Sequence, residues 1–183
     1  MIKIGAISCD GEVWDDKGRS DIVQIFISWT DGTGFTSGIN FIQFLYVENG
    51  TLVLSEKHGG KSGNKFNTVK LDYPSEFLTR LSGHVVYRDR GYDVDSITFG
   101  TNRGTHGPFG GSFEGTGEDD TFFDFQMGQD RPFGGFHGST MNGYLQSIGV
   151  YVRPIATLSN LNNTTTEIKK EYDDDSMNSH LES

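Results

Sequence analysis

Cysteine, proline and long apolar runs are all scarce in this chain of 183 residues. Cys9 is the only cysteine, so an internal disulfide is impossible. No apolar run approaches the roughly 20 residues that a membrane-spanning helix needs. The first residues, MIKIGAISCDG, lack the long apolar core of a signal peptide. We therefore expect a cytoplasmic protein, with the nucleus as a second compartment.

Basic residues are also few, because 15 lysines and arginines stand against 25 aspartates and glutamates, which gives a net charge of -10. Proteins that bind nucleic acids usually present a basic patch. Here the local basic residues are Arg80 and the pair Arg88 and Arg90, which Asp89 and Asp93 dilute. This composition excludes nucleic acid and the anionic membrane surface as main partners.

Signatures of catalysis are missing from the sequence. It contains no G-x-S-x-G motif, no P-loop and no dinucleotide-binding motif. His58, His106 and His137 each neighbour a glycine, but they lie far apart and lack the spacing of metal ligands. We expect no enzyme activity, no cofactor and no metal site.

The chain is rich in glycine and aromatic residues, with 25 glycines and 13% Phe, Trp and Tyr. This composition is typical of short strands joined by tight turns. In most segments rich in apolar residues, these alternate with polar ones, which predicts half-buried strands. Dipeptides such as Asn49-Gly50 and Gly134-Gly135 indicate turns between them. No long amphipathic helix is evident, so we predict an all-β fold. The clearest expected strands are Ile22–Trp29, Phe41–Tyr46, Thr51–Ser55, Thr68–Asp72, Leu78–His84, Asp95–Phe99, Thr121–Gln126 and Leu145–Val152.

A faint repeat accompanies these strands. Three similar triplets begin at Ile42, Ile97 and Ile148, and each follows a loop that contains glycine. The triplets are Ile-Gln-Phe, Ile-Thr-Phe and Ile-Gly-Val, spaced by 55 and then 51 residues. This spacing predicts three similar structural units.

Residues 155–183 differ in composition from the rest of the chain. From Pro154 onward there are six acidic and two basic residues, a net charge of -4, which leaves -6 for the remainder. The segment is rich in Asn, Thr, Ser and Asp and has too few apolar residues to offset the entropy of ordering. We predict one domain over 1–154 and a disordered acidic tail over 155–183. A solvated tail and a partner-binding or phosphorylated segment both fit this composition.

Four segments, in this order, carry a resemblance to a known family: Gly11–Asp16, Asn64–Gly83, Ser96–Gly110 and Gly134–Pro154. Together they resemble the jacalin-related lectins, over roughly residues 1–154. The resemblance implies a β-prism of three four-stranded Greek-key sheets with pseudo-threefold symmetry. The uninterrupted chain through Gly11 resembles the mannose-type branch of the family, whose members are mostly cytoplasmic.

The resemblance also implies a set of carbohydrate-binding residues. In the family, sugar contacts come from a loop near the N-terminus and from a loop before the last strand, which carries a glycine, three residues and an aspartate. Here that second loop reads Asn142-Gly143-Tyr144-Leu145-Gln146, so Asn142 holds the glycine position and Gln146 the aspartate position. Gly11 matches the N-terminal glycine, and Tyr92 matches a contact residue of a third loop. The candidate site is therefore Gly11, Tyr92, Asn142, Gly143, Tyr144 and Gln146.

Two functional hypotheses differ in the effect that the glutamine at position 146 has on sugar binding. A hydrogen bond to a carboxylate contributes roughly 1.5–3 kcal/mol, and a neutral one about 1 kcal/mol. Because a millimolar Kd corresponds to only about -4 kcal/mol, the exchange could remove measurable binding of a monosaccharide. One hypothesis is a lectin that binds mannose-type glycans or glycoproteins in a weak or altered manner. The alternative is a sugar-silent β-prism that acts as a protein–protein interaction module.

A narrower resemblance concerns biological role. Segments such as Met1–Gly5, Ser62–Asn64 and Phe133–Gly138 resemble plant jacalin-type proteins that restrict long-distance movement of potyviruses. This resemblance implies a function in plant antiviral defence, with protein partners in virus restriction. A homo-oligomer is a further expectation, because lectins gain avidity when several weak sites act together.

Overall fold

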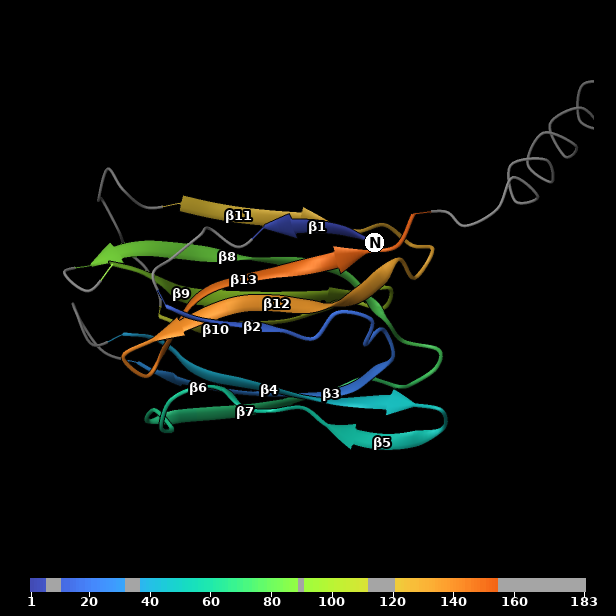
Figure 1. The fold of residues 1–183 in the computed structure, drawn as a ribbon, viewed down its shortest axis with the longest axis horizontal. Helices are drawn as coiled ribbons and strands as arrows, with labels where there is room; N and C mark the ends of the chain where they lie inside the picture. Colours follow the sequence, from blue (N-terminus) through green and yellow to red (C-terminus); the bar gives the residue numbers. More distant parts are fainter. Residues whose placement is uncertain (6–10, 32–36, 89–90, 112–120, 155–183) are drawn as a thin grey trace, which may run out of the picture. The chain divides into compact units, whose positions relative to one another are not determined.

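The computed structural model describes residues 1–5, 11–31, 37–88, 91–111 and 121–154, so Cys9 and the tail predicted for 155–183 lie outside the described residues. Within these ranges the chain forms thirteen strands and no helix. Antiparallel pairing gathers the strands into three sheets (Figure 1). No helix long and apolar enough for a membrane span is found among the residues described. The prediction of an all-β fold is confirmed.

A hairpin of two long strands forms the centre of each sheet. Alternation of side chains explains these strands, because Ile25 and Ile27 face the interior with no exposed surface while Phe26 between them stays half-buried on the outer face. The three hairpins are β3 (Ile22–Thr30) with β4 (Gly38–Glu48), β8 (Leu78–Arg88) with β9 (Gly91–Thr101), and β12 (Phe133–Met141) with β13 (Tyr144–Val152).

Shorter strands flank each hairpin and complete a Greek-key order. The sheet orders are β1-β13-β12-β2, β10-β9-β8-β11 and β5-β4-β3-β7. The first sheet unites the beginning and the end of the described chain, because β1 pairs with β13. The flanking strands are β1 (Ile2–Gly5), β2 (Glu12–Asp15), β5 (Thr51–Leu54), β7 (Lys65–Lys70), β10 (Thr105–Gly110) and β11 (Thr121–Gln126).

The third sheet contains one more short strand, β6 (His58–Gly59), beside its four-strand path. Both β5 and β6 pair with β4, at different points along its length. Ser55 lies between them and bonds to Phe44 through both its backbone and its hydroxyl. The strand beside β4 is thus interrupted after β5 and resumes at β6, so these two strands share one position and the sheet keeps the four positions expected of it.

The three triplets of the sequence repeat occupy equivalent strands, β4, β9 and β13, and their isoleucines are all buried. This arrangement confirms the prediction of three similar units. One phenylalanine from each sheet meets in the shared core, namely Phe44, Phe99 and Phe136. The rings of Phe44 and Phe136 stack with centroids 4.3 Å apart, and Phe99 meets Phe136 edge-on at 6.4 Å. Contacts between aromatic rings stabilise the core beyond the contribution of buried apolar surface.

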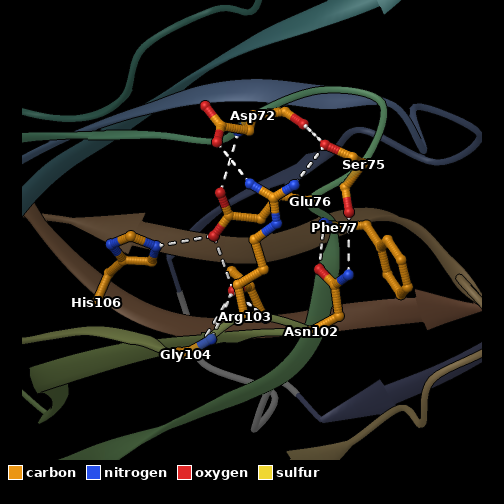
Figure 2. Close-up of polar contacts among 9 residues, drawn as sticks. Asp72, Ser75, Glu76, Phe77, Asn102, Arg103, Gly104 and His106 are labelled. Carbon is orange, nitrogen blue, oxygen red and sulfur yellow. Dashed lines mark hydrogen bonds and ion pairs between the residues drawn. The ribbon is translucent and has the colours of Figure 1, made fainter.

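A network of polar contacts joins the segment between β7 and β8 to the turn between β9 and β10 (Figure 2). The buried Glu76 accepts hydrogen bonds from the Asp72 N–H at 3.1 Å and from the Thr101 hydroxyl at 2.8 Å, and His106 Nε2 lies 3.4 Å from it. Burial alone would raise the pKa of Glu76, but these hydrogen bonds outweigh burial and hold its pKa below the usual value. Arg103 adds an ion pair with Asp72.

Candidate functional site

The candidate residues gather where β8 and β12 end and β9 and β13 begin (Figure 1). Gly11 immediately precedes β2, whose residue Glu12 pairs with Thr140 of β12. Neighbouring sheets therefore contribute loops to the same end of the domain. The Glu76 network connects turns at the other ends of β8 and β9.

Gly11 lies directly against Gln146. A β-carbon added to Gly11 would lie 2.6 Å from Gln146 Oε1 and 2.5 Å from the Thr140 carbonyl oxygen. Any other side chain at position 11 would therefore displace the glutamine or the backbone of β12. The absence of a side chain brings Gly11 into contact with Gln146, the residue expected at the aspartate position.

The side chain of Gln146 is enclosed, with only 2% of its surface exposed. Its Nε2 donates a hydrogen bond to Met141 Sδ at 3.1 Å. Its Oε1 is buried and accepts no hydrogen bond from any residue in the described part of the chain. On the side of Nε2 lies Gly91, whose added β-carbon would be 3.6 Å away. One acceptor at the centre of the candidate site is thus without a partner among the described residues.

The turn between β12 and β13 presents Asn142 and Gly143. Their φ angles of 51° and 81° are both positive, as a type I′ turn requires, and Asn-Gly is the preferred pair for it. Close approach accompanies this geometry, because a β-carbon on Gly60 would lie 2.5 Å from Gly143 Cα. The ring of Tyr144 is half-buried and lies near Gly38 of the third sheet.

Tyr92 is the second residue of β9, at this end of the domain. It pairs with Tyr87 across the β8–β9 hairpin, and the two rings meet edge-on with centroids 5.1 Å apart. Its neighbour Gly91 approaches Gln146. The sequence did not reveal that Gly91 and Met141 neighbour Gln146. No motif includes Met141 and could have indicated its contact.

A buried ion-pair network supports the hairpin beneath these loops. Arg88 Nη2 donates to Asp95 Oδ1 at 2.7 Å and to the Ser37 hydroxyl at 2.9 Å. Arg88 Nε also lies 3.5 Å from Asp93 Oδ2. Removing one member would leave an uncompensated buried charge, which is strongly destabilising. The network fixes residue 37, and hence Gly38 beside Tyr144, to the β8–β9 hairpin.

The chemistry available at this site is that of hydrogen bonding. Gln146 contributes a neutral amide, and the glycines allow Gly11 to pack closely on Gln146 and Gly60 on Gly143. No group of three or more His, Cys, Asp or Glu side chains suited to a metal ion occurs within the described ranges.

Comparison with known proteins identifies the group to which this arrangement belongs. The model of the Jacalin-like lectin domain matches residues 4–151. The chain belongs to the jacalin-related lectin family. Among the family's members, Protein RESTRICTED TEV MOVEMENT 1 of Arabidopsis thaliana is 38% identical to it over 156 residues, which is 84% of each chain.

Solved structures of jacalin-related lectins share the fold. A mannose-binding lectin from champedak has a TM-score of 0.67 and 30% identity, with 84% of this chain and 96% of that chain covered. Artocarpin in complex with mannopentose has a TM-score of 0.68 and 28% identity, covering 84% of this chain and 97% of that one. The resemblance to the family and the β-prism fold are both confirmed. The family is one of non-enzymatic lectin domains.

Proposed function

We propose that this jacalin-related lectin binds mannose-type glycans through the loops around Gln146, weakly as monosaccharides and more strongly as oligosaccharides or on several copies of the protein. The observation that carries the proposal is the contact of Gly11 with Gln146, which has a buried oxygen that accepts no hydrogen bond from the described residues. A sugar hydroxyl is a donor suited to such an oxygen. Gln146 offers a neutral acceptor where the family resemblance implies the carboxylate of an aspartate. The weaker hydrogen bond to a neutral acceptor accounts for weak binding.

The names of similar proteins support glycan binding and, in addition, a role in restricting virus movement. The champedak lectin is described as mannose-binding, and artocarpin was crystallised with mannose oligosaccharides. The name RESTRICTED TEV MOVEMENT 1 supports a role in restricting virus movement. We place that role in the cytoplasm, where a virus moving between plant cells would meet the protein. A homo-oligomer would raise the avidity of weak sites.

A second function is favoured by the enclosure of Gln146. Because only 2% of its surface is exposed and Nε2 is bonded to Met141, a sugar would need to reach an already packed side chain. A sugar-silent β-prism, acting as a protein–protein interaction module in virus restriction, accommodates this packing without rearrangement. The two functions differ in whether the loops around Gln146 contact a sugar.

Titration with methyl mannoside and with a mannose-rich oligosaccharide separates them. We expect the oligosaccharide to bind the wild type measurably and Tyr144→Ala to weaken this binding at least fivefold, since the ring lies beside the Asn142-Gly143 turn. Phe66→Ala provides the control, because that side chain is 57% exposed on β7, in the third sheet. No binding of either ligand at high protein concentration would reject the glycan proposal and favour the interaction module.

A further inference from the structure

The outer face of the third sheet carries an apolar strip. Ile25 and Phe44 point to the core, so their neighbours along β3 and β4 point outward. Cross-strand pairing places side chains of β5 and β7 on the same outer face. Leu52 and Leu54 of β5 and Phe66 of β7 are each more than half exposed. The apolar residues of this face are Phe26, Phe41, Leu45, Leu52, Leu54 and Phe66.

Lysines accompany this apolar strip. Residues 57–70 contain four lysines and no acidic residue, although the net charge of the chain is -10. This basic segment was not singled out from the sequence. Lys70 lies on the outer face with Phe66, because the two are an even number of residues apart on β7. Lys57 Nζ lies 5.1 Å from the centroid of the Phe41 ring. The face therefore combines exposed apolar side chains with positive charge.

We propose that the outer face of the third sheet binds an acidic amphipathic helix of another protein. An exposed apolar patch rimmed by polar residues is typical of an interaction site. The lysines select the partner by charge complementarity, and a second copy of this chain would present the same lysines. Leu52, Leu54 and Phe66 pack against the apolar side of the helix, and Lys57 and Lys70 pair with its carboxylates.

This proposal specifies a surface and a partner class for a protein interaction, and it holds whether or not the domain binds glycans. The residues that carry it belong to the third sheet, whereas Gln146 belongs to the first. Failure of the glycan titration would therefore leave this proposal standing, and failure of the experiments below would leave the glycan proposal standing.

A synthetic helix with leucine at every third or fourth position and glutamate at most others is the probe. The same helix with lysine in place of glutamate is its control. We expect calorimetry at low salt to show that the wild type binds the acidic helix about tenfold more tightly than the basic one. Salt at about 0.5 M should weaken binding of the acidic helix, because it screens exposed charges.

Two variants test the apolar strip and the charge separately. Leu54→Ser should weaken binding of the acidic helix about fivefold or more, since an apolar contact is lost. Phe122→Ala should leave it unchanged, because Phe122 is 55% exposed on β11 in the second sheet. Lys70→Glu should remove the preference for the acidic helix. Lys3→Glu makes the same charge change on β1 of the first sheet and should retain the preference.

A measurement on the wild type removes dependence on the folding of any variant. In nuclear magnetic resonance spectra, the acidic helix should shift the backbone amide signals of Leu54 and Phe66 and leave that of Phe122 unchanged. No saturable binding of the acidic helix, equal binding of the two helices, or saturation without these shifts would each overturn the proposal.

Other occupants of this face give results of their own. A dimer of the wild type in sedimentation experiments that Leu54→Ser dissociates would identify a second copy as the occupant. Binding to phosphatidylserine vesicles that Lys70→Glu removes, without binding of the acidic helix, would identify a membrane surface. Either result would overturn the proposal.

Discussion

Gly11 and Gln146 are in such close contact that a β-carbon on Gly11 would lie 2.6 Å from Gln146 Oε1. Real β-carbons do not approach other atoms this closely, so one of the two residues would have to move. The candidate site therefore depends on the missing side chain at position 11 as much as on the amide at position 146.

Gly11→Ala should abolish glycan binding by displacing Gln146, because the new methyl group also meets the Thr140 carbonyl oxygen 2.5 Å away. Calorimetry with a mannose-rich oligosaccharide measures the loss. Gly104→Ala is the matched control, since a β-carbon there would meet nothing within 4 Å. Unchanged affinity in Gly11→Ala would show that this contact has no part in binding.

Removal of the Glu76 carboxylate should destabilise the domain. Glu76→Ala leaves the Asp72 N–H and the Thr101 hydroxyl without their acceptor, and we expect about 1–3 kcal/mol of unfolding free energy to be lost. Urea denaturation measures the change. Arg103→Ala, which breaks a more exposed ion pair of the same network, should cost less. An equal or larger loss in Arg103→Ala would contradict the importance assigned to Glu76.

His137 should make the domain less stable in mild acid. Its ring is buried with Nε2 3.1 Å from the Ile4 carbonyl oxygen, and burial, with a contribution from Lys3, lowers its pKa below the ordinary 6.5. As the pH falls below about 6.5, the unfolded chain takes up a proton at this residue more readily than the folded one, so unfolding becomes easier. Above that pH the residue is neutral in both states and contributes no pH dependence.

Urea denaturation at several pH values between 7.5 and 5 tests this expectation. The wild type should lose stability toward pH 5 more steeply than His137→Gln, which cannot take up a proton there. The same slope in both proteins would contradict a lowered pKa for His137.

Alternating patterns in the sequence predicted the strands that bury one face, such as β3 with Ile25 and Ile27. The turn at Asn49-Gly50 was also predicted, and both residues have positive φ angles. Gly134-Gly135, interpreted as a turn, instead lies within β12, where the register shifts between Phe133 and Phe136. Glycine at position 135 allows close packing, because a β-carbon there would collide with the Asp16 carbonyl oxygen.

Besides β12, four strands were not among those expected, namely β1, β2, β6 and β10. None of them has a buried alternating face that could reveal it. β1, for example, is exposed at every residue and is defined by its pairing with β13. Of the candidate site, the family resemblance led to Gly11 and to Asn142–Gln146, which the structure brings to one end of the domain. The placement of Tyr92 against Tyr87 was not predictable, because it follows from pairing across the β8–β9 hairpin.

Calorimetric titration of the wild type and Gln146→Asp with a mannose-rich oligosaccharide tests the central claim most directly. If the loops around residue 146 form a glycan site with a weakened acceptor, both proteins bind, and the aspartate variant binds several-fold to about tenfold more tightly because a charged acceptor replaces a neutral one. Binding by the aspartate variant alone would identify a site that glutamine has made silent. Binding by neither protein would contradict the claim that these loops recognise glycans.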